Sequence, residues 1–372
     1  MATADHNPGI QPFGHRWWLE RVRRAAPRPR RFCPARFPPA KRGMFGSAGG
    51  AGFMNRPFRF GLALASVLLA IFSTNALASD SVTRVLTTAP PNLPESIAID
   101  HMGTTYLSLP FASKVVKFAP GGSLVTVATF PSFPLGVRLD PEGNVFVAVV
   151  GSGIWKVPAA GGPAVQVAAG SGLWNGLAFD HRGNLYVSES GGGAIWRLDK
   201  NGDFKLWSGS SLLKGTTSAG PCGLVHPAVP SFGPLGANGI AFNKHGDMLV
   251  ANTDFGEIIR ILTNPDGSAG TASVVSGPDC SLWGADGVAM DNADNLYVAA
   301  NSKGQIDRVD PAGHVHVLSA GDPLSFPSDI AFGTGRGDRT DIFISNFAAF
   351  PTSGGAPGVL EMDTGIPGSP LG

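Results

Sequence analysis

Short runs of alternating apolar and polar residues, separated by turns rich in glycine and proline, fill the chain from about residue 80 onward. The first unit of this pattern predicts four strands, at Ile97–Asp100, Thr105–Ser108, Lys114–Phe118 and Leu124–Thr129. Alternation with a period of two, together with many β-branched residues, is typical of strands. Helical heptads do not occur in the sequence. The pattern therefore predicts an all-β protein.

One phrase recurs six times in this part of the chain. Three clear copies are WNGLAFDHRGNLYVSES from Trp174, ANGIAFNKHGDMLVANTD from Ala237 and ADGVAMDNADNLYVAAN from Ala285. The apolar residues that anchor the six copies are 40, 40, 63, 48 and 42 residues apart, and they are Ile97, Val137, Leu177, Ile240, Val288 and Ile330. A period of roughly 40–45 residues with four short strands per repeat predicts a six-bladed β-propeller. A β-sandwich has no reason to repeat a phrase in this way.

The two ends of the repeat region predict how the ring closes. The sixth copy reaches its third strand, in GVLEMDT, before the chain ends. Residues 82–87 resemble the fourth strands of the other repeats and lead into the first copy. We therefore expect this N-terminal strand to complete the last blade, which removes the open edge of the sheet. The propeller is expected to span residues 79–372.

The first 78 residues have a different composition. Residues 1–53 contain ten Lys and Arg but only two acidic residues, and they lack apolar periodicity, which predicts a disordered basic extension. Residues 54–78 combine Arg56 and Arg59, an apolar run and a small-x-small site ending at Ala78, which is the pattern of a cleaved signal peptide. The apolar run is too short for a membrane anchor. Translation is therefore expected to begin at Met54, and the protein to be periplasmic or secreted.

The net charge of the expected mature chain argues against some classes of binding partner, and its cysteine content predicts a disulfide. Residues 79–372 carry 16 basic and 25 acidic side chains, a net charge of −9, which argues against nucleic acid or an anionic membrane as partner. Cys222 and Cys280 remain after signal cleavage. They lie in connections between blades at the same end of the propeller, so export predicts a disulfide between them. The alternative is two separate buried thiols.

The residues just before the repeated glycine occupy equivalent positions on the strand nearest the propeller axis, so they should form a ring around it. In chain order they are Glu95, Leu135, Asn175, Asn238, Asp286 and Ser328. Two carboxylates and two amide oxygens favour Ca²⁺, or another hard divalent cation, over Zn²⁺. Asn-Gly and Asp-Gly are also turn dipeptides, but here the hairpin turns have residues of their own.

With these motifs the chain resembles the gluconolactonase, regucalcin and luciferin-regenerating-enzyme family of calcium-dependent propeller hydrolases. The resemblance rests on LPES, WNGLAF, ANGIAF and ADGVAM, and it implies that Glu95, Asn175, Asn238 and Asp286 surround a central Ca²⁺. Two departures put a sugar-acid substrate in doubt. Ser96 stands where the family has glycine, and Leu173 and Trp174 stand where gluconolactonases tend to carry arginine. NHL-repeat and strictosidine-synthase-like propellers are near alternatives.

These observations lead to an expected function. We expect a monomeric hydrolase of lactones or related esters, in which Asp286 activates a water molecule or attacks the substrate itself. Asn175, Trp174 and His226 are the predicted substrate-binding residues; His226 lies in a long insertion, Lys214–Gly236, that is expected to cap the pocket. The alternative function is a non-catalytic NHL-type propeller that binds a ligand or a protein.

Overall fold

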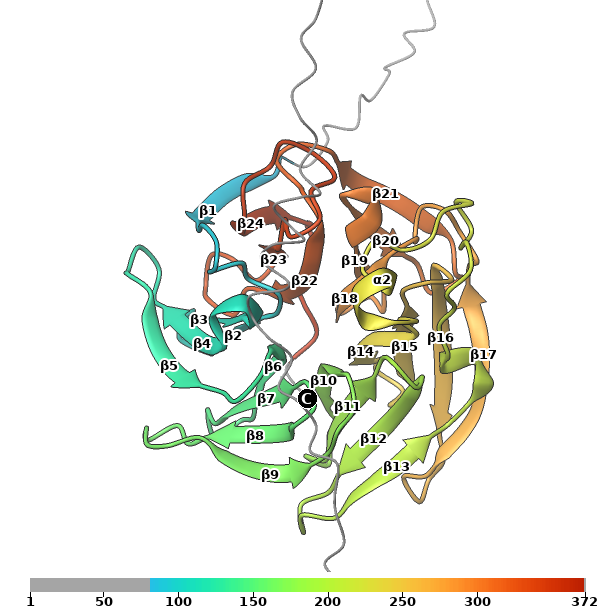
Figure 1. Ribbon diagram of the computed structural model, residues 1–372, viewed down its shortest axis with the longest axis horizontal. Helices are drawn as coiled ribbons and strands as arrows, with labels where there is room; N and C mark the ends of the chain where they lie inside the picture. Colours follow the sequence, from blue (N-terminus) through green and yellow to red (C-terminus); the bar gives the residue numbers. More distant parts are fainter. Residues whose placement is uncertain (1–80, 371–372) are drawn as a thin grey trace, which may run out of the picture. The chain divides into compact units, whose positions relative to one another are not determined.

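The computed structural model describes residues 81–370, which fold as six four-stranded antiparallel sheets arranged around a central axis (Figure 1). This confirms the predicted six-bladed propeller. The expected basic extension at residues 1–53 and the signal peptide at residues 54–78 lie outside the described residues. Among the helices of the described part, none has the length and apolarity needed to cross a bilayer.

The first three blades follow one another along the chain, and each adds its strands from the axis outward. Their strands are β2 (Ile97–Ile99), β3 (Thr105–Leu109), β4 (Lys114–Phe118) and β5 (Val125–Thr129); β6 (Pro134–Leu139), β7 (Val145–Val149), β8 (Gly153–Val157) and β9 (Val165–Ala169); β10 (Trp174–Phe179), β11 (Leu185–Glu189), β12 (Ala194–Leu198) and β13 (Phe204–Ser208). Each sheet is a simple antiparallel meander, so the inner strand always starts at the same end of the propeller. We call this end the mouth.

The last three blades repeat this arrangement, with one exception at the end. Their strands are β14 (Ala237–Phe242), β15 (Met248–Asn252), β16 (Glu257–Thr263) and β17 (Ala269–Ser276); β18 (Ala285–Met290), β19 (Leu296–Ala300), β20 (Gln305–Val309) and β21 (Val315–Ala320); β22 (Pro327–Phe332), β23 (Asp341–Asn346), β24 (Gly358–Asp363) and β1 (Thr83–Thr87). The short helices of the described residues lie in mouth-side connections: η1 (Pro110–Ala112), η2 (Ser211–Leu213), α2 (Val229–Phe232) and η3 (Asn301–Lys303).

The N-terminal strand closes the ring, as predicted. β1 pairs antiparallel with β24, with Thr83 opposite Glu361 and Thr87 opposite Gly358. Two side-chain hydrogen bonds add to the joint between the last and the first blade: the hydroxyl of Ser345 donates to Pro94 O at 2.8 Å, and that of Ser328 donates to Glu95 O. β1 therefore supplies the fourth strand of the last sheet, and the first inner strand is fixed against the sixth.

The apolar faces of the sheets pack against one another between the blades. Tyr186 of the third blade, for example, is fully buried against Phe242 of the fourth, with ring centroids 5.1 Å apart. Because the blades pack on both faces, second strands such as VFVAV of β7 and LYVAA of β19 are continuously apolar and buried. The inner strands differ from this apolar pattern, because they contain polar residues next to the propeller axis.

A β-bulge at the start of most inner strands explains how these polar residues reach the axis. In the third blade Trp174 pairs with Glu189 but Leu177 pairs with Val187, so Asn175 and Gly176 occupy an irregular position in the ladder. The same shift occurs in the second, fourth and fifth blades. A bulge places an extra residue and redirects its side chain. The residue before the glycine therefore lies within a bulged strand, and the turn interpretation of this dipeptide is wrong for β10, β14 and β18.

The glycine itself is needed because the inner strands approach each other closely. A Cβ atom on Gly239 would lie 2.2 Å from Asp286 O and 2.9 Å from the Cα of Gly287. Both of these atoms belong to the backbone of the next blade, so neither can rotate away. A residue larger than glycine at this position would push neighbouring blades apart.

Gly239→Ala is therefore expected to lower the free energy of unfolding by about 3 kcal/mol, through overpacking between two backbones. The measurement is urea-induced unfolding followed by tryptophan fluorescence. Gly337→Ala is the matched control, because a Cβ there meets no atom within 4 Å. It should change stability by no more than about 0.5 kcal/mol. Equal destabilisation by both variants would contradict the close approach.

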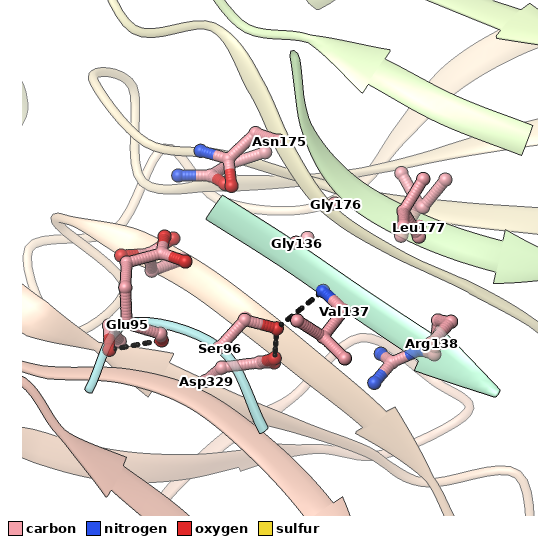
Figure 2. A pocket seen from close by; sticks show the side chains of 15 residues that line it. Glu95, Ser96, Gly136, Val137, Arg138, Asn175, Gly176, Leu177 and Asp329 are labelled. Atoms are coloured by element: carbon pink, nitrogen blue, oxygen red, sulfur yellow. Dashed lines mark hydrogen bonds between the residues drawn. The ribbon is translucent and has the colours of Figure 1, made fainter. Parts of the chain in front are cut away.

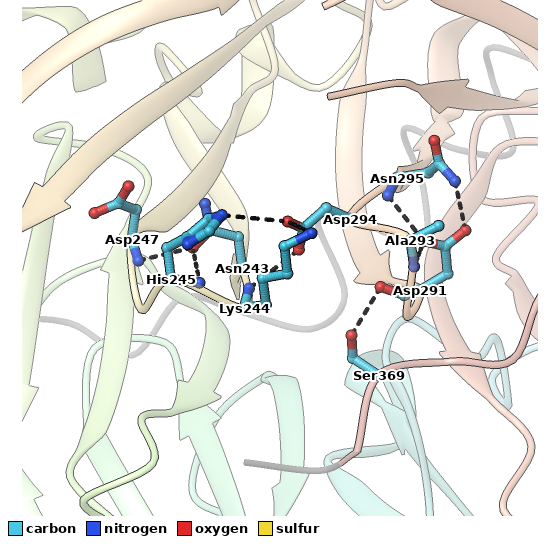
Figure 3. A network of polar contacts seen from close by, with 9 residues as sticks. All are labelled: Asn243, Lys244, His245, Asp247, Asp291, Ala293, Asp294, Asn295 and Ser369. Carbon is cyan, nitrogen blue, oxygen red and sulfur yellow. Dashed lines mark hydrogen bonds and ion pairs between the residues drawn. The ribbon is translucent and has the colours of Figure 1, made fainter. Parts of the chain in front are cut away.

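The hairpin turns at the other end of the inner strands are held by aspartate and asparagine side chains (Figure 3). Asp291 Oδ1 accepts from the backbone N–H groups of Ala293 and Asn295, both at 2.8 Å. Lys244 of the neighbouring blade forms an ion pair with Asp294 at 3.0 Å, and Ser369 donates to Asp291 O. These residues stabilise the far end of the propeller, while the ring of residues before the glycines lies toward the mouth.

Candidate functional site

A small cavity of about 20 Å³ lies among the inner strands (Figure 2). It is large enough for roughly one water molecule or one ion. The four predicted ligands all line it: Glu95, Asn175, Asn238 and Asp286. Ser328 also lines the cavity, whereas Leu135 does not. Five of the six blades thus place oxygen-bearing side chains around one point on the propeller axis.

Three carboxylates line this cavity, those of Glu95, Asp286 and Asp329, and the two that belong to the predicted ligands are close enough to repel each other. Glu95 and Asp286 each expose only 7% of their surface. Burial raises the pKa of Glu95 well above its usual range, and the charges of Asp286 and Asp329 raise it further. Burial likewise raises the pKa of Asp286, which hydrogen bonds from Asn301 and Asn238 oppose. Two like charges in such a place are costly unless a cation lies between them.

The polar atoms of the cavity fit a hard cation. Glu95 Oε2 is a buried oxygen without a hydrogen-bond partner in the described part of the chain. The amide nitrogen of Asn238 donates to Thr253 Oγ1 at 3.0 Å, which leaves its amide oxygen for another ligand. Carboxylate and amide oxygens are the donors that Ca²⁺ prefers. Within residues 81–370, no group of three or more His, Cys, Asp or Glu side chains is placed to hold a metal ion, so the two amides are essential to this donor set.

Ser96, which departs from the family pattern, has a structural role that its sequence position did not reveal. Its hydroxyl donates to Asp329 Oδ2 at 2.6 Å and accepts from the backbone N–H of Val137 at 3.1 Å (Figure 2). Asp329 occupies the glycine position of the sixth repeat, and it also accepts from the N–H of Ile97 at 3.1 Å. A serine and an aspartate thus replace the two glycines at the ring closure and link the first, second and sixth blades.

The structure separates Trp174 from the predicted substrate site. Trp174 exposes 3% of its surface and packs against Trp196 and Phe204, with ring centroids 5.8 and 5.4 Å away. Its indole N–H donates to Gly170 O at 3.0 Å. Trp174 keeps its regular pairing with Glu189 and packs into the core between blades, whereas Asn175 lies within the bulge and lines the cavity. We therefore leave Trp174 out of the proposed site.

His226 reaches the neighbourhood of the cavity, but as an internal residue. It exposes 3% of its surface, and its Nε2 lies 3.0 Å from Asn301 Oδ1. Asn301 Nδ2 in turn donates to Asp286 Oδ2 at 2.9 Å. The Lys214–Gly236 insertion therefore contacts the site through His226, although both ring nitrogens of this histidine are already paired with protein atoms.

Two fixed points hold the Lys214–Gly236 insertion over this end of the propeller. The predicted disulfide between Cys222 and Cys280 is confirmed, with Cα atoms 4.9 Å apart. At the base of the insertion, Asp254 Oδ2 accepts from the N–H groups of Thr216 at 2.9 Å and Leu235 at 2.7 Å. One carboxylate thus holds both ends of the insertion, and the disulfide holds its middle.

Cys222→Ser is expected to loosen the insertion more than the propeller core, because the blades keep their own cores between sheets. The disulfide closes a segment of 58 residues, so its loss should cost about 4 kcal/mol in the chain-entropy description. At labelling times short compared with global unfolding, hydrogen exchange measured by mass spectrometry should be faster at residues 214–236 and little changed at β18 and β19. Uniform acceleration throughout the propeller would contradict this expectation.

Residues at the ends of the second strands complete the site, although the repeated phrase before the glycine does not indicate them. Ser108, Thr253 and Asn301 lie at or just after the mouth ends of β3, β15 and β19, where they hydrogen-bond to Ser96, Asn238 and Asp286 respectively. A recurring signal marks them: the phrases YLSLP, LVANTD and YVAANS all place a polar residue after the second apolar run. A polar residue at the end of an otherwise buried strand is a candidate for supporting a site.

Comparison with known proteins agrees with this architecture. Residues 231–346 match the SGL family, described as the SMP-30/Gluconolactonase/LRE-like region, which confirms the family resemblance for that part of the chain. No curated protein matches the chain. The solved structures that resemble it include a gluconolactonase from Xanthomonas campestris (15% identity, 79% of this chain and 93% of that chain, TM-score 0.57).

Two further structures have the same fold under different names. One is the calcium-binding protein regucalcin from Agrobacterium tumefaciens (17% identity, 77% of this chain and 94% of that chain, TM-score 0.58). The other is virginiamycin B lyase from Staphylococcus aureus (15% identity, 72% of this chain and 82% of that chain, TM-score 0.50). At such identities the likeness shows the fold alone, so the function has to be argued from the site.

Proposed function

We propose that this six-bladed propeller, which contains an SMP-30/gluconolactonase/LRE-like region, is a Ca²⁺-dependent hydrolase of lactones or related esters. The observation that carries the proposal is the cavity on the propeller axis, where Glu95 and Asp286 are buried beside the amides of Asn175 and Asn238. A protein that only presents its outer loops to a partner has no need for two buried carboxylates at this point, because each costs stability when ionised.

Glu95, Asn238 and Asp286 are the residues that would hold the cation, with Asn175 as a further ligand or as a contact to the substrate. A bound Ca²⁺ supplies positive charge that polarises the substrate carbonyl. The unpaired Glu95 Oε2 supports this assignment, because an ionised carboxylate oxygen in a buried site requires a positive or hydrogen-bonding partner.

Asp286 is the proposed base. Its Oδ2 accepts from the amide of Asn301, and Asn238 donates a further hydrogen bond to the carboxylate. An ionised carboxylate has about four lone-pair sites, so it can still take a proton from water. The oxygen of that water then adds to the carbonyl carbon, and the C–O bond to the alkoxy group breaks as this group takes up the proton. A lactone gives a hydroxy acid in this reaction, and an ester gives an acid and an alcohol. Burial raises the pKa of the Asp286 carboxyl, whereas a bound cation would favour its ionised form, which is the form that accepts a proton.

Aromatic side chains from three blades pack together in the mouth-side connections. Phe111, which follows β3, lies against Phe133 and Phe347, with ring centroids 5.9 and 5.7 Å apart. These three aromatic residues come from mouth-side connections of the first, second and sixth blades. Phe111 and Phe347 belong to a hydrophobic cluster, and none of the three rings lines the cavity. The absence of an arginine before Asn175 is the feature that favours aryl esters or other lactones over sugar acids.

The test is hydrolysis of a panel of lactones and aryl esters, measured before and after treatment with a calcium chelator. We expect activity that the chelator removes and that added Ca²⁺ restores. Activity that survives chelation would contradict the calcium-dependent mechanism. Complete inactivity towards the whole panel, in protein that binds Ca²⁺, would favour the alternative of a non-catalytic binding propeller.

Export is part of the proposal. The Cys222–Cys280 disulfide supports it, because such bonds persist mainly in oxidising compartments. Expression of the full chain in a bacterium should give a mature protein outside the cytoplasm that begins at Ser79, as measured by N-terminal sequencing. A cytoplasmic product that retains residues 54–78 would contradict the proposed signal peptide.

A further inference from the structure

A chain of hydrogen bonds connects the Lys214–Gly236 insertion to the proposed base. It runs from His226 in the insertion, through Asn301 at the start of η3, to Asp286 on β18. All three side chains are at least 93% buried. The aromatic rings of Trp283 and Phe326 lie next to His226, with centroids 6.3 and 6.0 Å away, and they shield it from solvent.

The partners of His226 determine which of its nitrogens carries the proton. The backbone N–H of Ala228 points to Nδ1 at 3.3 Å, so Nδ1 must accept a hydrogen bond. Nε2 then carries the hydrogen and donates to Asn301 Oδ1 at 3.0 Å. Burial lowers the pKa of His226 to about 4, so the imidazole is neutral at neutral pH. A histidine with both nitrogens paired in this way is not available as a general base or as a substrate ligand.

The orientation of the Asn301 amide follows from the same reasoning. Its oxygen accepts from His226 and also from the hydroxyl of Ser302 at 2.9 Å. Its nitrogen must therefore face Asp286, whose ionised carboxylate only accepts, and it donates to Oδ2 at 2.9 Å. Two donors thus fix the amide, and the amide fixes one oxygen of the carboxylate.

We infer that His226 and Asn301 are positioning residues for Asp286, and that the insertion serves the site by supplying His226. Neither residue touches the substrate. Together they hold the Asp286 carboxylate in the single orientation that serves both the cation and the attacking water. This inference rests on the proposed function for its catalytic consequence. Its structural part, the orientation of Asp286 by His226 through Asn301, is testable without catalysis.

The experiment compares His226→Phe, which keeps a ring at this buried position but removes the donor, with His226→Gln, which keeps an N–H donor. Loss of such a supporting hydrogen bond typically costs about 10–100-fold in metal affinity or activity. We expect His226→Phe to lower kcat and the Ca²⁺ affinity measured by calorimetry to this extent, with KM nearly unchanged. His226→Gln should recover most of both. The control is His245→Phe, at an exposed position on the far end of the propeller.

A third measurement uses the unmodified protein. Nitrogen-15 NMR should show His226 protonated at Nε2 and unprotonated at Nδ1 from about pH 5.5 to 8. Wild-type kcat and Ca²⁺ affinity in His226→Phe, no advantage of Gln over Phe, or the opposite tautomer would each overturn the inference. If the protein hydrolyses nothing, the proposed function fails, while calorimetry and NMR still decide whether His226 orients Asp286.

Discussion

Asp286→Asn should lower kcat for lactones or aryl esters by about 10³-fold, while the propeller remains folded. The amide cannot take a proton from water, and the loss of a general base typically costs 10²–10⁴-fold. Asparagine has nearly the same shape, so the buried position on β18 stays filled. Steady-state kinetics at saturating Ca²⁺ measures the loss. Circular dichroism verifies that the variant is folded.

The matched control for this substitution is Asp310→Asn. Asp310 lies in the turn between β20 and β21, where it contacts His314 and His316 at the surface. It takes no part in the cavity, so kcat should remain within about twofold of the unmodified protein. If Asp286→Asn behaved like this control, Asp286 would not be the base, and the mechanism proposed for the cavity would be wrong.

Glu95→Gln should raise the melting temperature of the Ca²⁺-free protein and at the same time abolish Ca²⁺ binding. In the Ca²⁺-free protein at pH 8 this variant should unfold at a higher temperature than the unmodified chain, because a neutral amide replaces a buried carboxylate that is repelled by Asp286 and Asp329. The stabilisation by Ca²⁺ should disappear in the variant. In the unmodified protein, Ca²⁺ at 100 times its dissociation constant should add about 2.7 kcal/mol by mass action.

The contribution of Glu95 to the folding stability of the Ca²⁺-free protein should decrease as the pH rises. The pKa of Glu95 is raised in the folded state, so its protonated form stabilises the fold below the pKa of the unfolded chain, which is about 4.3 for a glutamate. That contribution is lost as pH rises through the folded-state pKa. Other buried acids behave alike, since burial raises the pKa of Asp254 to about 6 and that of Asp307 to about 7. The stability difference between Glu95→Gln and the unmodified protein should therefore grow from pH 4 upward.

Glu142→Gln is the control for this comparison. Glu142 is exposed in the far-side turn of the second blade, so its substitution should shift neither the melting temperature nor the effect of Ca²⁺. Scanning calorimetry with chelator and with Ca²⁺ at several pH values provides all the data. A Glu95→Gln variant that melts below the unmodified protein without Ca²⁺, or that keeps the Ca²⁺ effect, would contradict the role assigned to Glu95.

The period of the repeats was enough to predict the fold and most of the ring. Equivalent positions of a propeller repeat lie at equal distances from the axis, so aligning the phrase brings Glu95, Asn175, Asn238 and Asp286 together without coordinates. The disulfide followed from the same logic, because Cys222 and Cys280 lie in mouth-side connections one blade apart. These features depend on the spacing along the chain, which the sequence contains in full.

Features that depend on side-chain direction could not be predicted in this way. The sequence places Trp174 beside Asn175, but only the bulge shows that one faces the core and the other the cavity. Asp329 replaces a glycine, and its partner Ser96 lies 233 residues away. His226 belongs to an insertion outside the repeat, so no equivalent position in another blade could indicate its contact with Asn301.

The number of Ca²⁺ ions bound per chain decides whether the axial cavity is a metal site. The measurement is elemental analysis of purified protein dialysed against micromolar Ca²⁺, with Glu95→Gln and Glu142→Gln treated in parallel. The cavity volume of about 20 Å³ and the donor set of two carboxylates and two amides predict one ion per chain in the unmodified protein and in Glu142→Gln, and none in Glu95→Gln. No bound Ca²⁺ in the unmodified protein, or one ion in Glu95→Gln, would contradict the assignment of the cavity as the calcium site.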